Sequence, residues 1–167
     1  MTEKVFRNYL EIKNQVDFKE VEKPSKSYTV KIVDPKDNQL NKFFYKKIGK
    51  NCQWVDRLIW TDLNWIDYVS NEKLFTYILK DRDEIVGYFE LLLNENNQEA
   101  EIAYLGILAE YFGKQLGGYL LSEAIKQSFR MKSSRVWVHT CSLDHKNALR
   151  NYLSRGMKIF KSETLIR

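Results

Sequence analysis

A cluster of glycines is the strongest chemical signal in this sequence. Four of the seven glycines in the 167 residues lie between positions 106 and 118. Gly113, Gly117 and Gly118 fall at the start of an amphipathic stretch that is typical of a helix, and Lys114 adds a mobile cation. The free N–H groups and the dipole at a helix start attract anions, and glycine lets the backbone come close to them. The cluster therefore predicts a phosphate-binding turn.

The spacing of these glycines matches neither common nucleotide-binding motif. The Walker A motif needs Ser or Thr directly after Gly-Lys, where this chain has Gln115, and the G-x-G-x-x-G dinucleotide fingerprint is absent. A purely structural interpretation is that Gly117 and Gly118 let the helix pack closely on a sheet. The spacing alone leaves both interpretations equally open.

A second group of reactive side chains, His139, Cys141 and His145, suggests a metal site at first sight. Their H-x-C-x-x-x-H spacing matches no zinc module, and no fourth ligand is evident. Nothing else in the sequence indicates a Cys-His-Asn arrangement that would make Cys141 a nucleophile. We therefore expect core or surface roles for these residues, and no metal.

The hydrophobic pattern predicts a mixed α/β sheet that positions these residues. Extended alternation indicates strands, three of them successive and antiparallel, and apolar residues at helical spacing indicate helices that cover the sheet. The first 27 residues are mixed and polar, with at most a short strand at 9–12. The expected strands are 27–34, 73–80, 84–94, 99–108, 135–141 and 157–166; the expected helices are 35–48 (ending at Gly49), 61–69, 113–131 and 144–155.

The segment around the glycine cluster matches one half of a known signature. Glu110, Gly113 and Gln115 occupy the defined positions of the pattern Gln/Arg-x-x-Gly-x-Gly/Ala. One glycine is kept and two positions depart from the pattern. Gly117 falls where a further glycine is common.

The other half of the signature follows in register. A buried strand, RVWVHT, precedes a short helix that ends in Tyr-x-x-x-Gly, here Tyr152 to Gly156. Ala148 stands four residues before the tyrosine, and His145 stands where an asparagine is frequent. On these two motifs, which cover roughly residues 74–160, the sequence resembles the GNAT superfamily of acyl-CoA N-acyltransferases.

The resemblance implies a fold and a cofactor site. The fold is a mixed, mostly antiparallel sheet with helices on both faces and a crevice for acetyl-CoA where two central strands splay apart. The pyrophosphate would lie on the N–H groups of residues 113–118, and the pantetheine arm would pair with residues 106–108. The implied cofactor-binding residues are Gly106, Ile107, Leu108, Phe112, Gly113, Lys114, Gln115, Leu116, Gly117, Gly118 and His145.

Acetyl transfer by direct attack, through a tetrahedral intermediate, needs a neutral amine, a stabilised oxyanion and a proton for the departing thiolate. The resemblance places Tyr152 beside the thioester sulfur, where it would act as the acid. Glu101, six residues before Ile107, is the leading base, with Glu90 in reserve; a backbone N–H near Ile107 would meet the oxyanion. The structural alternatives are a packing role for Tyr152 and a solvent-facing strand position for Glu101.

Residues 54–68 are unusually aromatic and include Trp54, Trp60, Trp65 and Tyr68. In the resemblance this segment lies in the two helices that border the acceptor site. A wall for the acceptor and ordinary core packing are equally supported, because four aromatic residues exceed what one buried stripe needs.

Composition bounds the remaining choices. The length favours one domain over residues 1–167, and 27 Lys and Arg against 22 Asp and Glu give a net charge of +5, too little to predict nucleic-acid binding. No apolar run is long enough for a membrane span, the charged start is unlike a signal peptide, and two cysteines build no disulfide framework. We expect a cytoplasmic N-acetyltransferase that uses acetyl-CoA and an amine acceptor, a small molecule or a protein, with homodimerisation open. The alternative is a non-catalytic acyl-CoA-binding or regulatory domain of the same fold.

Overall fold

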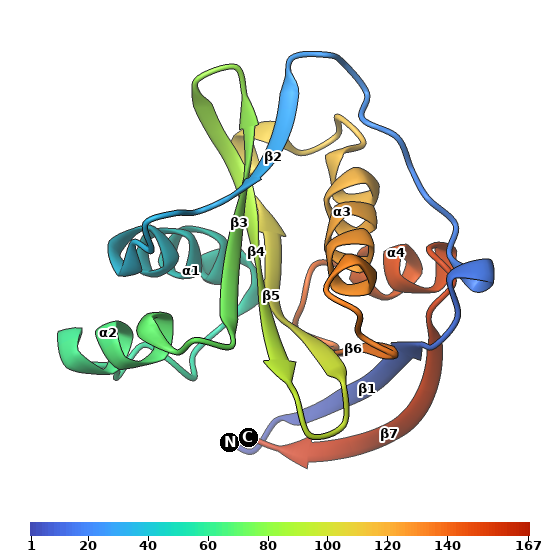
Figure 1. Cartoon of the computed structure of the whole chain (residues 1–167). Helices are drawn as coiled ribbons and strands as arrows, with labels where there is room; N and C mark the ends of the chain where they lie inside the picture. The colour runs from blue at the N-terminus through green and yellow to red at the C-terminus, as the bar shows by residue number, and fades with distance from the viewer.

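The chain forms one seven-stranded sheet in the order β2-β3-β4-β5-β6-β1-β7, in a computed structural model that describes all 167 residues (Figure 1). Every neighbouring pair is antiparallel except β5 and β6. The predicted mixed, mostly antiparallel sheet is therefore confirmed. The strands are β1 (Lys4–Ile12), β2 (Tyr28–Ile32), β3 (Leu74–Asp81), β4 (Glu84–Asn94), β5 (Glu99–Ile107), β6 (Arg135–Cys141) and β7 (Lys158–Ile166); the helices are α1 (Asn38–Cys52), α2 (Asp62–Ser70), α3 (Leu116–Arg130) and α4 (Ala148–Ser154), with short 3-10 turns at Gln15–Asp17 and Ala109–Tyr111.

The centre of the sheet opens between β5 and β6. Only three residue pairs, from Glu99↔Arg135 to Glu101↔Trp137, join these two parallel strands. Beyond them β5 continues to Ile107 on the β4 side alone, with a bulge opposite Glu90 and Leu91. A strand edge with free N–H and C=O groups therefore faces an opening in the middle of the molecule.

Helices cover both faces of the sheet: α1 and α2 lie on one side, and α3 and α4 on the other (Figure 1). The larger core, between the sheet and α3, contains 19 buried residues, and a smaller one of six lies under α1. Asp37 caps α1, and Thr61 with Asn64 forms a capping box on α2. No side chain caps α3, which starts after the left-handed residue Gln115.

Several helix boundaries differ from those expected from the sequence. Helix α1 starts three residues later than expected, at Asn38, after its cap Asp37. Helix α1 continues through Gly49 to Cys52; at Gly49 a Cβ would lie 2.8 Å from the Cβ of Trp54, so glycine here makes room for the chain that returns over the helix. Helix α3 starts three residues late, at Leu116, because Gly113 and Gln115 both have positive φ angles. Helix α4 starts at Ala148, after a turn in the preceding loop.

The N-terminal strand β1 is longer than the sequence pattern indicated, and its place was not predicted. It spans Lys4–Ile12 and lies between β6 and β7, antiparallel to both. The two chain ends lie side by side (Figure 1), joined by backbone hydrogen bonds between Glu3 and Arg167. Because β1 pairs with β6, its side chains reach the opening between β5 and β6.

None of the helices has the length and apolar character needed to cross a membrane.

Candidate active site

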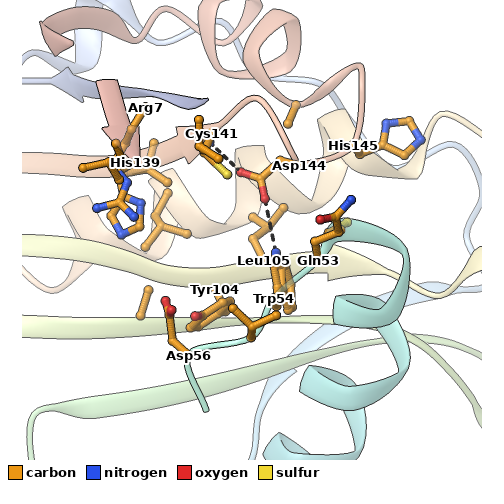
Figure 2. Close-up of a pocket in the computed structure, with 18 of the residues that line it drawn as sticks. Arg7, Gln53, Trp54, Asp56, Tyr104, Leu105, His139, Cys141, Asp144 and His145 are labelled. Atoms are coloured by element: carbon orange, nitrogen blue, oxygen red, sulfur yellow. Dashed lines mark hydrogen bonds between the residues drawn. The ribbon is translucent and has the colours of Figure 1, made fainter. Parts of the chain in front are cut away.

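The opening between β5 and β6 holds two connected cavities. One, here called the helix-end cavity, has a volume of about 400 Å³ and lies between the end of β5, the start of α3 and α4. The other, the strand cavity, has about 490 Å³ and lies between β1, β5, β6 and the segment after α1 (Figure 2). Four residues line both cavities: Leu105, His145, Ala148 and Tyr152.

The helix-end cavity offers backbone N–H groups. Gln115 makes no capping hydrogen bond, so the first N–H groups of α3 stay free, unlike those of the capped helices α1 and α2. Gly113 has a φ of +80°, and a Cβ there would meet nothing within 4 Å. At Gly117 a Cβ would come no closer than 3.6 Å to the Asn151 side chain. The turn is therefore open to a phosphate group, with the positive end of α3 behind it.

The free edge of β5 supplies a further N–H group. Leu108 donates its N–H to the carbonyl of Val86 on β4 at 2.8 Å. Because N–H groups alternate between the two sides of a strand, the N–H of Ile107 points away from β4, into the opening. Pairing of an extended ligand with β5 thus has an edge available at Leu105–Ile107.

Leu108 itself does not fit its predicted cofactor role. Its N–H is taken by Val86, its carbonyl accepts the N–H of Tyr111 at 2.9 Å, and its side chain is buried in the smaller core. Lys114 also lies outside the cavity lining, with its ammonium group 5.2 Å from the Tyr111 ring. The other predicted residues do line the helix-end cavity: Gly106, Ile107, Phe112, Gly113, Gln115, Leu116, Gly117, Gly118 and His145.

Tyr152 lies where the two cavities join. It comes from α4, is 8% exposed and makes no side-chain hydrogen bond within the chain. Burial, with the nearby charge of Asp144, raises the pKa of its hydroxyl above the ordinary value. The hydroxyl therefore stays protonated at neutral pH and is free to donate a hydrogen bond to a group in the opening.

The two predicted carboxylates lie elsewhere. Glu101 lines a third cavity, beside Trp137 and the end of β4, and burial raises the pKa of its carboxyl. Glu90 has no exposed surface and accepts hydrogen bonds from Asn41, Arg57 and Tyr68. Such a carboxylate has no access to a substrate, so the reserve role of Glu90 as a base is wrong.

Most aromatic residues of the segment after α1 pack around the side chain of Arg57. Its guanidinium group holds Glu90 with two hydrogen bonds of 3.1 and 3.2 Å. Burial alone would lower the pKa of Arg57, but the Glu90 carboxylate raises it above the ordinary value. Aromatic rings surround the charge, those of Tyr45, Trp60, Trp65, Tyr68 and Tyr104, with ring centres 4.1 to 5.6 Å from its central carbon. Three of the four segment aromatics therefore serve packing.

Trp54, the remaining one, lines the strand cavity and reaches across the opening. Its indole N–H donates to Asp144 at 3.2 Å, and Figure 2 shows this bond joining the segment after α1 to the loop after β6. Asp144 also accepts hydrogen bonds from the Thr140 hydroxyl and the Cys141 N–H, at 2.5 and 3.0 Å. This pair of residues makes one wall of the strand cavity.

Asp144, Arg7 and His139 were missed as candidates for this site. Arg7 lies opposite Cys141 in the β1–β6 register, diagonally next to His139, and all three line the strand cavity. Burial and the charge of Arg7 lower the pKa of His139. The position of Asp144 just after a predicted buried strand was the one available signal, since loops at strand ends carry functional residues. No group of three or more His, Cys, Asp and Glu side chains in the structure could hold a metal ion.

Comparison with known proteins identifies the family of the chain and proteins that share its fold. Residues 36–157 match the Acetyltransferase (GNAT) family, while the curated protein sequences contain no significant match. A GCN5-related N-acetyltransferase from Sphaerobacter thermophilus shares the fold with a TM-score of 0.74 at 17% identity, over 97% of this chain and 50% of that one. The chain thus spans about half the length of that structure.

Two shorter solved structures are also similar. An aminoglycoside acetyltransferase from an uncultured soil metagenomic sample, in complex with trehalose, gives a TM-score of 0.64 at 13% identity, covering 80% of this chain and 90% of that one. A GNAT family acetyltransferase from Streptococcus pneumoniae gives 0.58 at 21% identity, covering 78% and 87%. At these identities the structures show a shared fold alone. The family match covers well over half of the sequence, and on that ground the chain belongs to the GNAT acetyltransferase family.

Proposed function

We propose that the protein is an N-acetyltransferase that moves the acetyl group of acetyl-CoA directly to a primary amine. The observation that carries this proposal is the position of Tyr152, a buried tyrosine with a free hydroxyl at the junction of the two cavities. The helix-end cavity suits the cofactor, and the strand cavity suits the acceptor. The junction is where the reacting groups of the two would meet.

The helix-end cavity fits the chemistry of coenzyme A. The uncapped N–H groups of α3 and the open turn at Gly113 would bind the pyrophosphate, and the free edge of β5 would pair with the amide-containing arm. Bound acetyl-CoA would supply an activated acetyl group. The N–H of Ile107 would stabilise negative charge that develops on the carbonyl oxygen.

Tyr152 would assist the departing sulfur by donating a hydrogen bond. Its pKa is raised above that of an ordinary tyrosine, whereas a thiol ordinarily has a pKa of about 8.5. Complete proton transfer from this tyrosine to a thiolate is therefore uphill. Hydrogen-bond donation that strengthens as the sulfur gains charge fits the residue better.

Glu101 is proposed as the base that takes the amine proton. Its raised pKa suits this task, because a carboxylate with a higher pKa is a stronger base. Since Glu101 lines the neighbouring cavity and not the strand cavity, the proton would travel through water. Glu101→Gln should then lower the turnover rate at pH values above the pKa of Glu101 and below that of the amine, where the carboxylate is charged and little free amine is present. Glu99→Gln is the matched control on the same strand.

The proposal is tested by binding and by turnover. Calorimetry should show saturable acetyl-CoA binding, and an assay of free thiol should show turnover with members of a panel of amines. Tyr152→Phe should lower kcat while acetyl-CoA binding is kept. Unchanged kcat in this variant would remove Tyr152 from its role, and no acetyl-CoA binding by the wild-type protein would overturn the whole proposal.

A non-catalytic acyl-CoA-binding domain is the alternative, favoured by one observation. Gln115 holds a left-handed conformation at a position where the family pattern has glycine or alanine. Binding of acetyl-CoA without turnover of any amine would support this alternative. Either proposal includes a cytoplasmic location, since both cysteines, Cys52 and Cys141, are free thiols that suit a reducing compartment.

A further inference from the structure

The strand cavity contains a positive charge that the chain itself leaves poorly paired. The Nη1 atom of Arg7 lies 3.5 Å from the Tyr9 hydroxyl and 3.7 Å from the nearest carboxylate oxygen, on Glu163. Its Nε atom is buried without any hydrogen-bond partner. Glu163 is bound more closely by the Tyr9 hydroxyl, at 2.7 Å. Arg7 therefore has hydrogen-bond donors to spare on the cavity wall.

Two other half-buried or buried arginines of the sheet region show what full pairing looks like in this chain. Arg57 makes two hydrogen bonds of 3.1 and 3.2 Å to Glu90. Arg135 lies 2.9 Å from Glu99 and 3.3 Å from Glu11. The Arg7 side chain is 28% exposed, and only its Nε atom is buried without a partner. A guanidinium on a cavity wall whose contacts are this loose can bind a carboxylate with two hydrogen bonds, so Arg7 indicates a site for an anion that the chain does not provide.

A carboxylate, that of Asp144, lines the same cavity as Arg7 and Tyr152. Asp144 binds the N–H of Cys141, and Cys141 lies directly opposite Arg7 in the β1–β6 register. In Figure 2, Arg7 and His139 lie at one end of the cavity, while Asp144 and Trp54 lie nearer its centre. Asp56 faces the cavity from the far wall and is exposed. Arg7 and Asp144 thus line the same cavity from two paired elements, β1 and the loop that follows β6.

We propose that the acceptor is an amino-acid-like molecule, whose carboxylate binds Arg7 and whose amine lies between Asp144 and Tyr152. This inference rests on the proposed acetyl transfer and names its acceptor class. Because Arg7, Asp144 and Tyr152 line one cavity, the site suits a single molecule that carries both a carboxylate and an amine. A volume of about 490 Å³, with Val5, Ile102, Val138 and Leu165 on its walls, leaves room for an apolar side chain.

The test uses acceptors that differ only in the carboxylate, namely leucine against leucinamide and phenylalanine against phenylalaninamide. The amides have the less basic and therefore more readily deprotonated amine, so a preference for the free acids cannot arise from amine reactivity. Wild-type protein should show kcat/KM at least about 10-fold higher for the acids, the size of one charge-assisted hydrogen bond. Arg7→Gln should bring this ratio close to one, and Arg7→Lys, which keeps the charge without the fork, should give an intermediate ratio.

Arg135→Gln is the matched control, because Arg135 lies on the same sheet but does not line the strand cavity. It should keep the wild-type ratio. Calorimetry with N-acetylleucine and its amide gives a readout that needs no turnover, and Arg7→Gln should remove a preference for the acid. Equal use of acids and amides, a ratio unchanged by Arg7→Gln, or no binding of either product overturns the acceptor class. If the wild-type protein does not bind acetyl-CoA, that separate result contradicts the proposed transferase activity and not the acceptor class alone.

Discussion

The two cavities that meet at Tyr152 are built in different ways. The helix-end cavity is formed mainly by one short segment of the chain, between Gly106 and Gly118, and its binding groups are backbone N–H groups. The strand cavity combines side chains from β1, β6 and the segment after α1, which are up to 136 residues apart in the sequence, from Val5 to Cys141. Backbone binding sites need only a local conformation, whereas side-chain sites need distant elements to be placed correctly.

The largest effect should come from the charged pair beneath the side-chain-built cavity. Arg57→Met leaves the fully buried Glu90 without its partner and should lower the free energy of unfolding by about 3–5 kcal/mol. Urea denaturation measures this change. Glu95→Gln, which breaks an exposed pair with Lys73, is the control and should cost less than about 1 kcal/mol. Similar losses for both variants would show that burial of the Arg57 pair does not stabilise this region.

The second effect concerns the backbone-built cavity. Gly117→Val places a branched side chain beside the first free N–H groups of α3 and should weaken acetyl-CoA binding about 10- to 100-fold, the value of a hydrogen bond to a charged group. Thermal stability should be kept, because valine has a higher helix propensity than glycine. Calorimetry measures the affinity, with Gly117→Ala as the smaller control. Unchanged affinity in the valine variant would contradict a phosphate site at this helix start.

The third effect tests whether the two cavities bind acceptor and acetyl-CoA independently. Trp54→Phe removes the N–H that binds Asp144 but keeps an aromatic ring against Tyr104. The KM for the acceptor should rise several-fold, while acetyl-CoA affinity should stay the same. Steady-state kinetics and calorimetry together check this prediction. A parallel loss of acetyl-CoA affinity would mean that the two cavities do not act as separate sites.

The difference between a site formed by one local segment and a site formed by distant side chains explains what the sequence could predict. Strand 135–141 and the glycine turn were found because period, glycine content and motif spacing are local properties. Tyr152 became a candidate because the family resemblance includes its motif, Tyr-x-x-x-Gly. The sequence indicated only a fragment of β1, because the adjacent apolar pairs Val5-Phe6 and Tyr9-Leu10, separated by Arg7 and Asn8, break the period of two that is typical of a strand.

The residues of the strand cavity had no local signal. Arg7 meets Cys141 across 134 positions, and Trp54 meets Asp144 across 90. Only the sheet order, with β1 inserted between β6 and β7, brings Arg7 to the opening. Glu90 was a candidate base because it lies on the strand next to that of Glu101. Arg57, from the loop between α1 and α2, binds the Glu90 carboxylate and so keeps a substrate from reaching it.

The smallest effect tests how strictly the backbone-built cavity depends on conformation. Gln115 has a φ of 60° at the start of α3, a left-handed conformation that costs a non-glycine residue about 1 kcal/mol. Gln115→Gly removes this cost, but the greater freedom of glycine in the unfolded chain offsets part of the gain. We expect a net stabilisation below about 1 kcal/mol and a few-fold tighter binding of acetyl-CoA, since the side chain no longer lines the cavity. Arg82→Gly is the matched control: Arg82 also has a left-handed φ, of 54°, in the β3–β4 turn, and it lines neither cavity. Both variants should gain stability by urea denaturation, but only Gln115→Gly should change the acetyl-CoA affinity. Tighter binding in the Arg82 variant as well would trace the effect to overall stability and not to the turn at α3.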